Sequence, residues 1–134
     1  MTNKKINPWR TRVVVLSQLL FFVTVPHTLE DFVLGEPASH QVPVTVLAGV
    51  VAGLFALQGL GLFLVGGDQR SGYAIHLGLG LLWPLAAGSA QLPTILAGPV
   101  YRSGFISLFY VFGMMTLGIL LFLGSFLSLR DATK

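Results

Sequence analysis

Hydrophobic residues fall into four long stretches separated by short polar joints, at residues 13–34, 42–65, 72–92 and 103–129. A helix needs about 20 mostly apolar residues to cross a hydrocarbon core of about 30 Å. Each stretch meets that length. The pattern therefore predicts an all-α fold, an integral membrane four-helix bundle that forms one domain over residues 1–134.

The composition agrees with this pattern and excludes several kinds of protein. Charged residues make up 10% of the chain, against about 25% in soluble domains, and the mean hydropathy is +0.80. The chain has no cysteine, which excludes disulfides, thiolate metal sites and dithiol redox chemistry. The net charge of +3 does not indicate nucleic-acid binding, because the basic residues lie outside the apolar stretches, where they serve topology.

The basic residues predict the orientation of the chain in the membrane. Seven of the eight Lys and Arg residues lie in the two termini and the second loop, and Arg102 alone lies in the third loop. The first loop carries Glu30, Asp31 and Glu36 and no basic residue. Because Lys and Arg in short loops mark the cytoplasmic side, we expect a multi-pass cell-membrane protein with both termini cytoplasmic.

The first stretch could also be a cleaved signal peptide, since basic residues precede it. It lacks a small-x-small cleavage site and continues through Pro26 and His27. We therefore expect it to remain as the first membrane helix.

Small residues mark a packing face on the second stretch. Gly49 and Gly53 are four residues apart and share a helix face, and Ala48, Ala52 and Ala56 form the neighbouring row. Such ridges allow close helix contact in lipid. We favour contact within the bundle. The alternative is a seam in a homo-oligomer or a larger membrane complex.

The polar residues near the outer end of the first stretch are the main candidate site. If the helix continues through Pro26, then His27, Glu30 and Asp31 fall at i, i+3 and i+4 on one face. An imidazole and two carboxylates there suit proton handling or a metal ion, and His40 could join them. If Pro26 instead begins a new short helix, the same residues form a solvated loop.

A second polar layer is expected near the cytoplasmic side of the bundle. Its members lie at similar depths in their stretches: Ser17, Gln18, Gln58, Tyr73, His76 and Ser125. We interpret them as groups that hydrogen-bond between helices. The alternative is a small polar cavity open to the cytoplasm. We expect substitutions at His27, Glu30 or Asp31 to impair function. Substitutions at Gln58 and His76 should instead alter stability or association.

Aromatic residues extend the candidate site into the membrane. Trp83 lies near mid-span, where its indole N–H needs a hydrogen-bond partner. Tyr110 is expected in the same outer half, with several Phe residues around it. An aromatic pocket there could hold a lipid-like ligand, a quinone or a carotenoid. The predicted ligand-binding residues are therefore His27, Glu30, Asp31, Trp83 and Tyr110.

We predict no metal site and name no cofactor. A di-iron bundle needs Glu and Glu-x-x-His from several helices, and the second to fourth stretches have no Glu. Haem would need two suitable ligands, but His27 and His76 are expected at opposite depths. A bis-His site would then require His40 or a second protomer.

No catalytic or nucleotide-binding motif occurs in the sequence. We therefore expect a small membrane protein that binds or passes a small apolar or amphipathic molecule, or that serves as an accessory subunit of a membrane complex. Its partners would be the lipid bilayer and other membrane helices, with no nucleic acid. The alternative is an intramembrane redox or acid–base enzyme for a quinone- or sterol-like substrate, acting through His27, Glu30 and Asp31.

Overall fold

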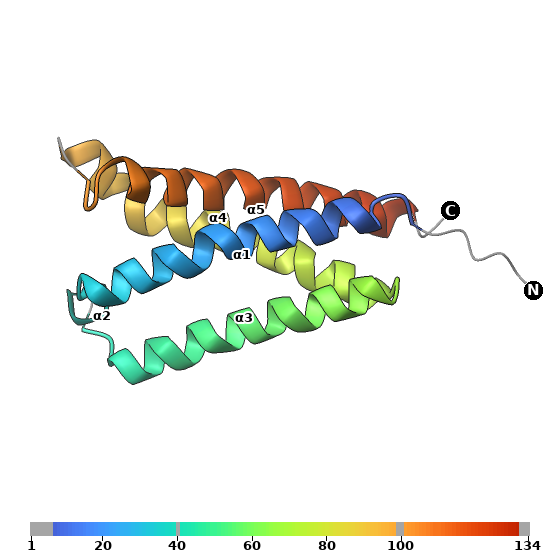
Figure 1. Ribbon diagram of the computed structural model, residues 1–134, viewed down its shortest axis with the longest axis horizontal. Helices are drawn as coiled ribbons and strands as arrows, with labels where there is room; N and C mark the ends of the chain where they lie inside the picture. Colours follow the sequence, from blue (N-terminus) through green and yellow to red (C-terminus); the bar gives the residue numbers. More distant parts are fainter. Residues whose placement is uncertain (1–6, 40, 99–100, 132–134) are drawn as a thin grey trace, which may run out of the picture.

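The computed structural model describes residues 7–39, 41–98 and 101–131. Its elements are four long helices and one short helix, and the described residues form no strand. In chain order they are α1 (Arg10–Val33), α2 (Glu36–Ser39), α3 (Val44–Gly66), α4 (Arg70–Ala97) and α5 (Phe105–Asp131) (Figure 1). The all-α prediction is confirmed, and the four long helices are long and apolar enough to cross a membrane.

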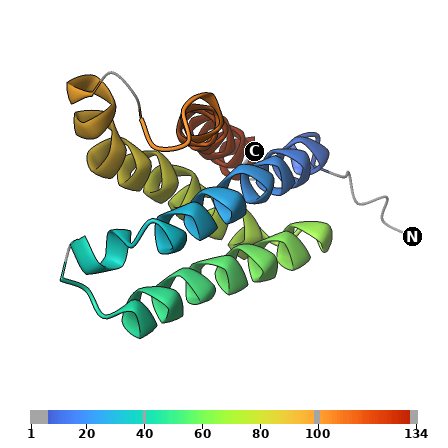
Figure 2. The same cartoon turned by 60° about the vertical axis from the view of Figure 1, so that its left-hand side comes forward.

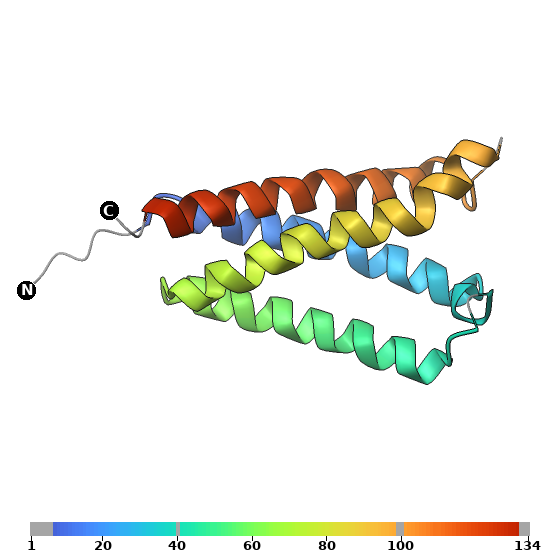
Figure 3. The same cartoon turned by 180° about the vertical axis from the view of Figure 1, so that it is seen from behind.

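The long helices form an up-and-down bundle with two distinct ends. At the terminal end, α1 begins, α5 finishes and a tight turn joins α3 to α4 (Figure 3). At the loop end lie α2 and the connections from α1 to α3 and from α4 to α5. Helix α5 packs against α4 and α1, whereas α3 packs mainly against α4. No described residue of α3 approaches α5, so α3 lies at one edge of the bundle (Figure 2).

Prolines do not end the long helices. Helix α1 continues through Pro26, and α4 continues through Pro84 and Pro93 to Ala97, beyond the end predicted at residue 92. The ring of Pro84 packs onto Gly118 of α5, where a Cβ atom would lie 2.4 Å from the Pro84 Cγ atom. The solvated-loop alternative for the residues after Pro26 is therefore wrong.

Two glycines of α4 allow close approach of backbones. A Cβ atom on Gly72 would lie 2.5 Å from the backbone nitrogen of Val65, and one on Gly80 would lie 2.5 Å from that of Phe122. These positions join α4 to α3 and α5. Gly49 and Gly53 behave differently, because a Cβ atom on either would meet no atom within 4 Å. Our expectation that their ridge packs within the bundle is wrong, since the ridge faces outward.

Helix α3 packs into the bundle mainly through its second half, which lies nearer the terminal end. Only 11% of its most apolar 18-residue window is buried, against 28–33% in the other long helices. Its buried residues are Gln58, Gly61 and Val65, all in the half nearer the terminal end. The other half leaves room for a cavity beside α1 and α4.

Candidate functional site

One face of α1 presents an imidazole between two carboxylates. The Nδ1 atom of His27 lies 3.7 Å from Oε2 of Glu30, and its Nε2 atom lies 3.8 Å from Oδ2 of Asp31. The His27 side chain is only 2% exposed. These distances exceed ordinary hydrogen-bond lengths, so each contact is an electrostatic attraction only when the imidazole is protonated.

Arg102, in the connection between α4 and α5, neutralises part of this charge. Its guanidinium forms ion pairs with Asp31 of α1 and Glu36 of α2, and it lies 5.2 Å from the centroid of the Tyr101 ring. Burial opposes the charge of Arg102, but the hydrogen bond and ion pair with Asp31 outweigh burial and raise its pKa. Arg102 thus links α1, α2 and the connection between α4 and α5 through charged hydrogen bonds.

Two further hydrogen-bond pairs complete the loop end. The hydroxyl of Ser107 donates to Oε1 of Glu30 and accepts the Ser103 backbone N–H at 3.1 Å. The hydroxyl of Tyr101 donates to Oε1 of Gln91 at 2.6 Å, and burial raises the Tyr101 pKa to about 12. We name six residues the loop-end cluster: His27, Glu30, Asp31, Glu36, Arg102 and Ser107. It holds three carboxylates against one permanent cation.

A cavity of about 270 Å³ adjoins this cluster between α1, α3 and α4. His27, Asp31 and Gln91 line its loop end, and Trp83 lines its deeper part. The rest of the wall is mostly apolar and includes Leu47, Val51 and Leu54 of α3 and Ala86, Ala87 and Ala90 of α4. The cavity thus has an apolar body and one polar end, as ligand pockets commonly do.

Two side chains in the cavity wall carry unsatisfied polar atoms. The indole Nε1 of Trp83 and the Nδ1 of His27 are buried and have no hydrogen-bond partner among the described residues. The Trp83 ring is held by stacking on Phe55, with centroids 5.7 Å apart. An unsatisfied buried donor costs about 1–3 kcal/mol, and few buried polar groups in proteins remain unpaired. Both residues therefore keep unused hydrogen-bonding capacity beside the cavity.

The predicted site residues are therefore only partly brought together. His27, Asp31 and Trp83 line one cavity, and Glu30 lies beside it. Tyr110 is not among the residues that line it and instead contacts the ring of Phe109, with centroids 5.9 Å apart. His40 lies outside the described residues.

The second polar layer is a buried network of three helices. The Nε2 atom of Gln58 donates to the backbone oxygen and Oγ of Ser17 at 3.0 and 3.1 Å. His76 contacts the Ser17 Oγ through Nε2 at 2.8 Å and the Gly72 carbonyl through Nδ1 at 2.8 Å. A carbonyl can only accept, so Nδ1 carries the proton and Nε2 accepts from the Ser17 hydroxyl. Ser17, Gln58 and His76, the buried network, are each 0% exposed.

The other residues expected in this layer do not join the buried network. Gln18 is exposed at the surface of α1, beside Phe63 of α3. Tyr73 donates to Oδ1 of Asp68 at 2.9 Å, and the buried Ser125 hydroxyl has no hydrogen-bond partner among the described residues. Polar residues at one depth therefore do not form one site.

The two layers lie far apart. His76 contacts Ser17, which precedes His27 by ten residues of α1 or about 15 Å of helix. His27 and His76 thus cannot ligate one haem within this chain. Across the described ranges, no group of three His, Asp or Glu side chains is arranged to hold a metal ion.

Sequence reasoning missed Arg102, Ser107 and the Tyr101–Gln91 pair as parts of the site. The sequence did contain an indication for Arg102, which is the one basic residue of the third loop. An up-and-down bundle places the third loop beside the acidic first loop, so an ion pair between the two loops could have been predicted. Comparisons with protein-family models, with curated proteins and with solved structures find no match to this chain.

Proposed function

We propose that this chain is a multi-pass membrane protein that holds a small, mostly apolar molecule in the cavity between α1, α3 and α4. Four helices long and apolar enough to cross a bilayer support the membrane location. The single observation that carries the ligand is the cavity itself, about 270 Å³ in volume, with apolar walls and a polar end.

The polar groups of the cavity suggest the chemistry of its ligand. Asp31 is already paired with Arg102, so its charge is largely committed to the fold. The unsatisfied atoms belong to Trp83 and His27. The ligand that fits is an apolar body with a carbonyl or hydroxyl group that accepts a hydrogen bond from the Trp83 indole.

The surface that surrounds the cavity suggests how such a molecule enters. Val50 and Leu82 line the cavity and are also exposed on the outside of the bundle, at 55% and 39%. In a bilayer these residues face lipid. A molecule could enter from the lipid phase by passing between α4 and the loosely packed half of α3. Helices α4 and α5 would stay in contact during such entry.

The test is to purify the protein gently from its own membrane and to identify bound small molecules by mass spectrometry. Trp83→Phe keeps the aromatic stack on Phe55 and removes the indole donor. Because one hydrogen bond contributes about 1 kcal/mol, we expect Trp83→Phe to lower the affinity for the identified molecule about fivefold. Trp9→Phe is the control, since Trp9 does not line this cavity. Preparations that contain no stoichiometric small molecule would contradict the proposal.

A redox or acid–base enzyme is the second candidate, favoured by the position of His27 between two carboxylates. It is less well supported, because Asp31 is bound by Arg102 and Glu30 by Ser107. An absorption spectrum and metal analysis of the purified protein distinguish the candidates. Visible bands, stoichiometric metal or turnover of the identified molecule would favour the enzyme.

The outward ridge of α3 supports a proposal about partners. Gly49 and Gly53 lie on the face of α3 opposite Leu47 and Leu54, so the ridge and the cavity can be occupied together. Small residues four apart promote close helix contact in lipid, and we propose a second copy of this chain as the partner. Gly53→Leu should shift cross-linked dimer toward monomer in vesicles. Gly78→Leu is the matched control, since a Cβ atom there also meets nothing within 4 Å.

We further propose that the terminal end faces the cytoplasm. The distribution of Lys and Arg supports this orientation, and α1 begins beside the end of α5, with Asn7 donating to the Ser128 hydroxyl at 2.7 Å. Reporter fusions at both termini and in the α1–α3 connection test it. An extracytoplasmic C-terminus would overturn the orientation without affecting the proposed cavity.

A further inference from the structure

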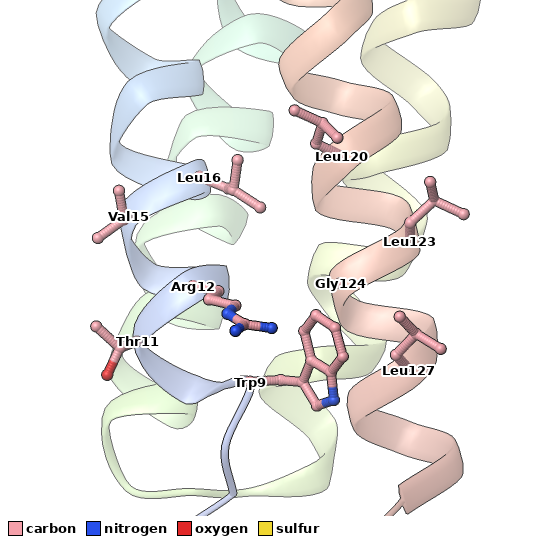
Figure 4. Close-up of a pocket in the computed structure, with 9 residues that line it drawn as sticks. All are labelled: Trp9, Thr11, Arg12, Val15, Leu16, Leu120, Leu123, Gly124 and Leu127. Carbon is pink, nitrogen blue, oxygen red and sulfur yellow. The ribbon is translucent and has the colours of Figure 1, made fainter.

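A second, larger cavity lies on the opposite side of α1, in a groove between α1 and α5 near the terminal end. Its volume is about 460 Å³. Figure 4 shows leucines of α5 along one wall and residues of α1 along the other. The apolar lining residues are Val15, Leu16, Leu120, Leu123, Gly124 and Leu127. The leucines extend over about 10 Å of helix, so the groove has the form of a slot for a chain-like apolar group.

A cation lies at the terminal end of this groove. Figure 4 shows Arg12 and Trp9 between the two helices, below Leu16 and Leu120, and the Arg12 guanidinium carbon lies 4.7 Å from the centroid of the Trp9 ring. The side chain of Arg12 is exposed and makes no ion pair with any residue that the structure describes. Trp9 thus holds the guanidinium in place without neutralising it.

The carboxylate that Trp9 contacts is already engaged. Asp131 accepts the Trp9 indole N–H at 3.1 Å through Oδ2, and its Oδ1 atom lies 3.8 Å from Nε of Arg130. Arg10, two residues before Arg12, adds positive charge at the same end of α1. The local charge balance therefore favours an anion beside Arg12.

We infer that the α1–α5 groove binds an anionic phospholipid, with one acyl chain along the leucines and the phosphate on Arg12. Trp9 supports this placement, since tryptophan prefers the headgroup level of a membrane, and a guanidinium pairs with phosphate through two parallel hydrogen bonds. The inference rests on the proposed membrane location and does not depend on a ligand in the other cavity.

The experiment uses quenching of Trp9 fluorescence by brominated lipids in vesicles. The protein carries Trp83→Phe, which leaves Trp9 as the only tryptophan, because the chain contains two. We expect brominated phosphatidylglycerol to quench Trp9 more strongly than brominated phosphatidylcholine at equal mole fraction. Arg12→Gln should reduce this preference about fivefold, the contribution of one basic residue near an anionic surface, and Arg12→Lys should retain only part of it, because lysine keeps the charge but not the two parallel hydrogen bonds. Arg70→Gln is the matched control for charge, as another exposed arginine at the terminal end.

A second pair of variants tests the groove itself. Val15 lines the groove and is 46% exposed, whereas Leu19 lies one turn further along α1, is 47% exposed and does not line it. Val15→Phe should fill the slot and lower quenching by brominated phosphatidylglycerol, and Leu19→Phe should leave quenching unchanged. Because both side chains lie at the surface, neither substitution disturbs the core.

Three outcomes would overturn the inference. These are equal quenching by the two lipids, an unchanged preference in Arg12→Gln, and equal effects of the two phenylalanine variants. Flotation of the same samples separates this inference from the proposed function. Protein that fails to float with either kind of vesicle would refute the membrane location and the lipid site together. Protein that floats without a lipid preference would refute the lipid site alone.

Discussion

The loop-end cluster and the buried network are both polar, yet they differ in charge and in surroundings. The cluster uses carboxylates and an arginine at the end of the bundle, where Asp31 and Glu36 are 24% and 33% exposed. The network uses an amide, a hydroxyl and a neutral imidazole, each 0% exposed. In a chain that crosses a bilayer, as we propose for this one, a charge deep in the membrane costs at least about 2.5 kcal/mol, which accounts for charged groups at the end of the bundle and neutral polar groups inside it.

The two regions also differ in what adjoins them. His27 and Asp31 of the cluster line one end of a cavity, and the rest of the cavity wall is mostly apolar. In the buried network, His76 instead packs against Gly61, where a Cβ atom would lie 2.6 Å from its Cε1 atom. The cluster therefore borders open space in the bundle, whereas the network is enclosed by packing and joined by hydrogen bonds.

The largest expected effect comes from removing the cation of the cluster. Arg102→Met leaves Asp31 and Glu36 without their common partner. Breaking a buried ion pair costs about 3–5 kcal/mol, and partial exposure of both carboxylates reduces the expected loss to about 2 kcal/mol. Denaturant unfolding in detergent micelles measures it.

Two further variants sharpen this prediction. The triple variant Arg102→Met, Asp31→Asn and Glu36→Gln should regain part of the lost stability, because it removes the two carboxylates that Arg102 binds together with Arg102 itself. Arg70→Met should change stability by no more than about 0.5 kcal/mol, since Arg70 is exposed. If Arg102→Met unfolds at the same denaturant concentration as the parent, the ion pairs do not hold the loop end together.

Much of the fold could be predicted from the sequence, because the length of an apolar stretch sets whether a helix can cross a membrane. The geometry of the ridge could not. Gly49 and Gly53 form a small-residue face on α3. The sequence of such a face is the same whether it packs against another helix of the bundle or faces outward. Gly72 and Gly80, which make the close backbone contacts, have no sequence pattern that separates them from Gly78.

The candidate site shows a similar division. The i, i+3, i+4 spacing correctly placed His27, Glu30 and Asp31 on one helix face, because helix geometry fixes such neighbours. The spacing could not show that Arg102 forms an ion pair with Asp31. That contact depends on how the connection between α4 and α5 folds against α1. The sequence predicts that changes at Asp31 impair function while the bundle stays folded. The ion pair now makes Asp31→Asn a test of stability as well.

An intermediate effect is expected at the centre of the buried network. Ser17→Ala removes the hydroxyl that accepts from Gln58 and donates to His76. Hydrogen bonds between membrane helices contribute about 0.6 kcal/mol on average, so losing two should cost about 1 kcal/mol. Ser125→Ala is a matched control, because the Ser125 hydroxyl is equally buried but unpaired among the described residues. Equal unfolding midpoints for the two variants would show that the network contributes no stability.

The smallest effect should distinguish two glutamines that the sequence placed at similar depth. Gln58 donates to Ser17 from a fully buried position, but its Oε1 atom has no partner among the described residues. Gln58→Leu therefore loses the donated bonds and relieves one unsatisfied acceptor, for a net cost of about 0.6 kcal/mol. Gln18 is exposed beside Val14 and Phe63 at the surface of α1 and α3, and Gln18→Leu should cost nothing or stabilise slightly. Paired melting curves in one detergent resolve this difference. A larger loss for Gln18→Leu than for Gln58→Leu would mean that depth in the membrane, rather than partnership within the bundle, determines what a polar side chain contributes.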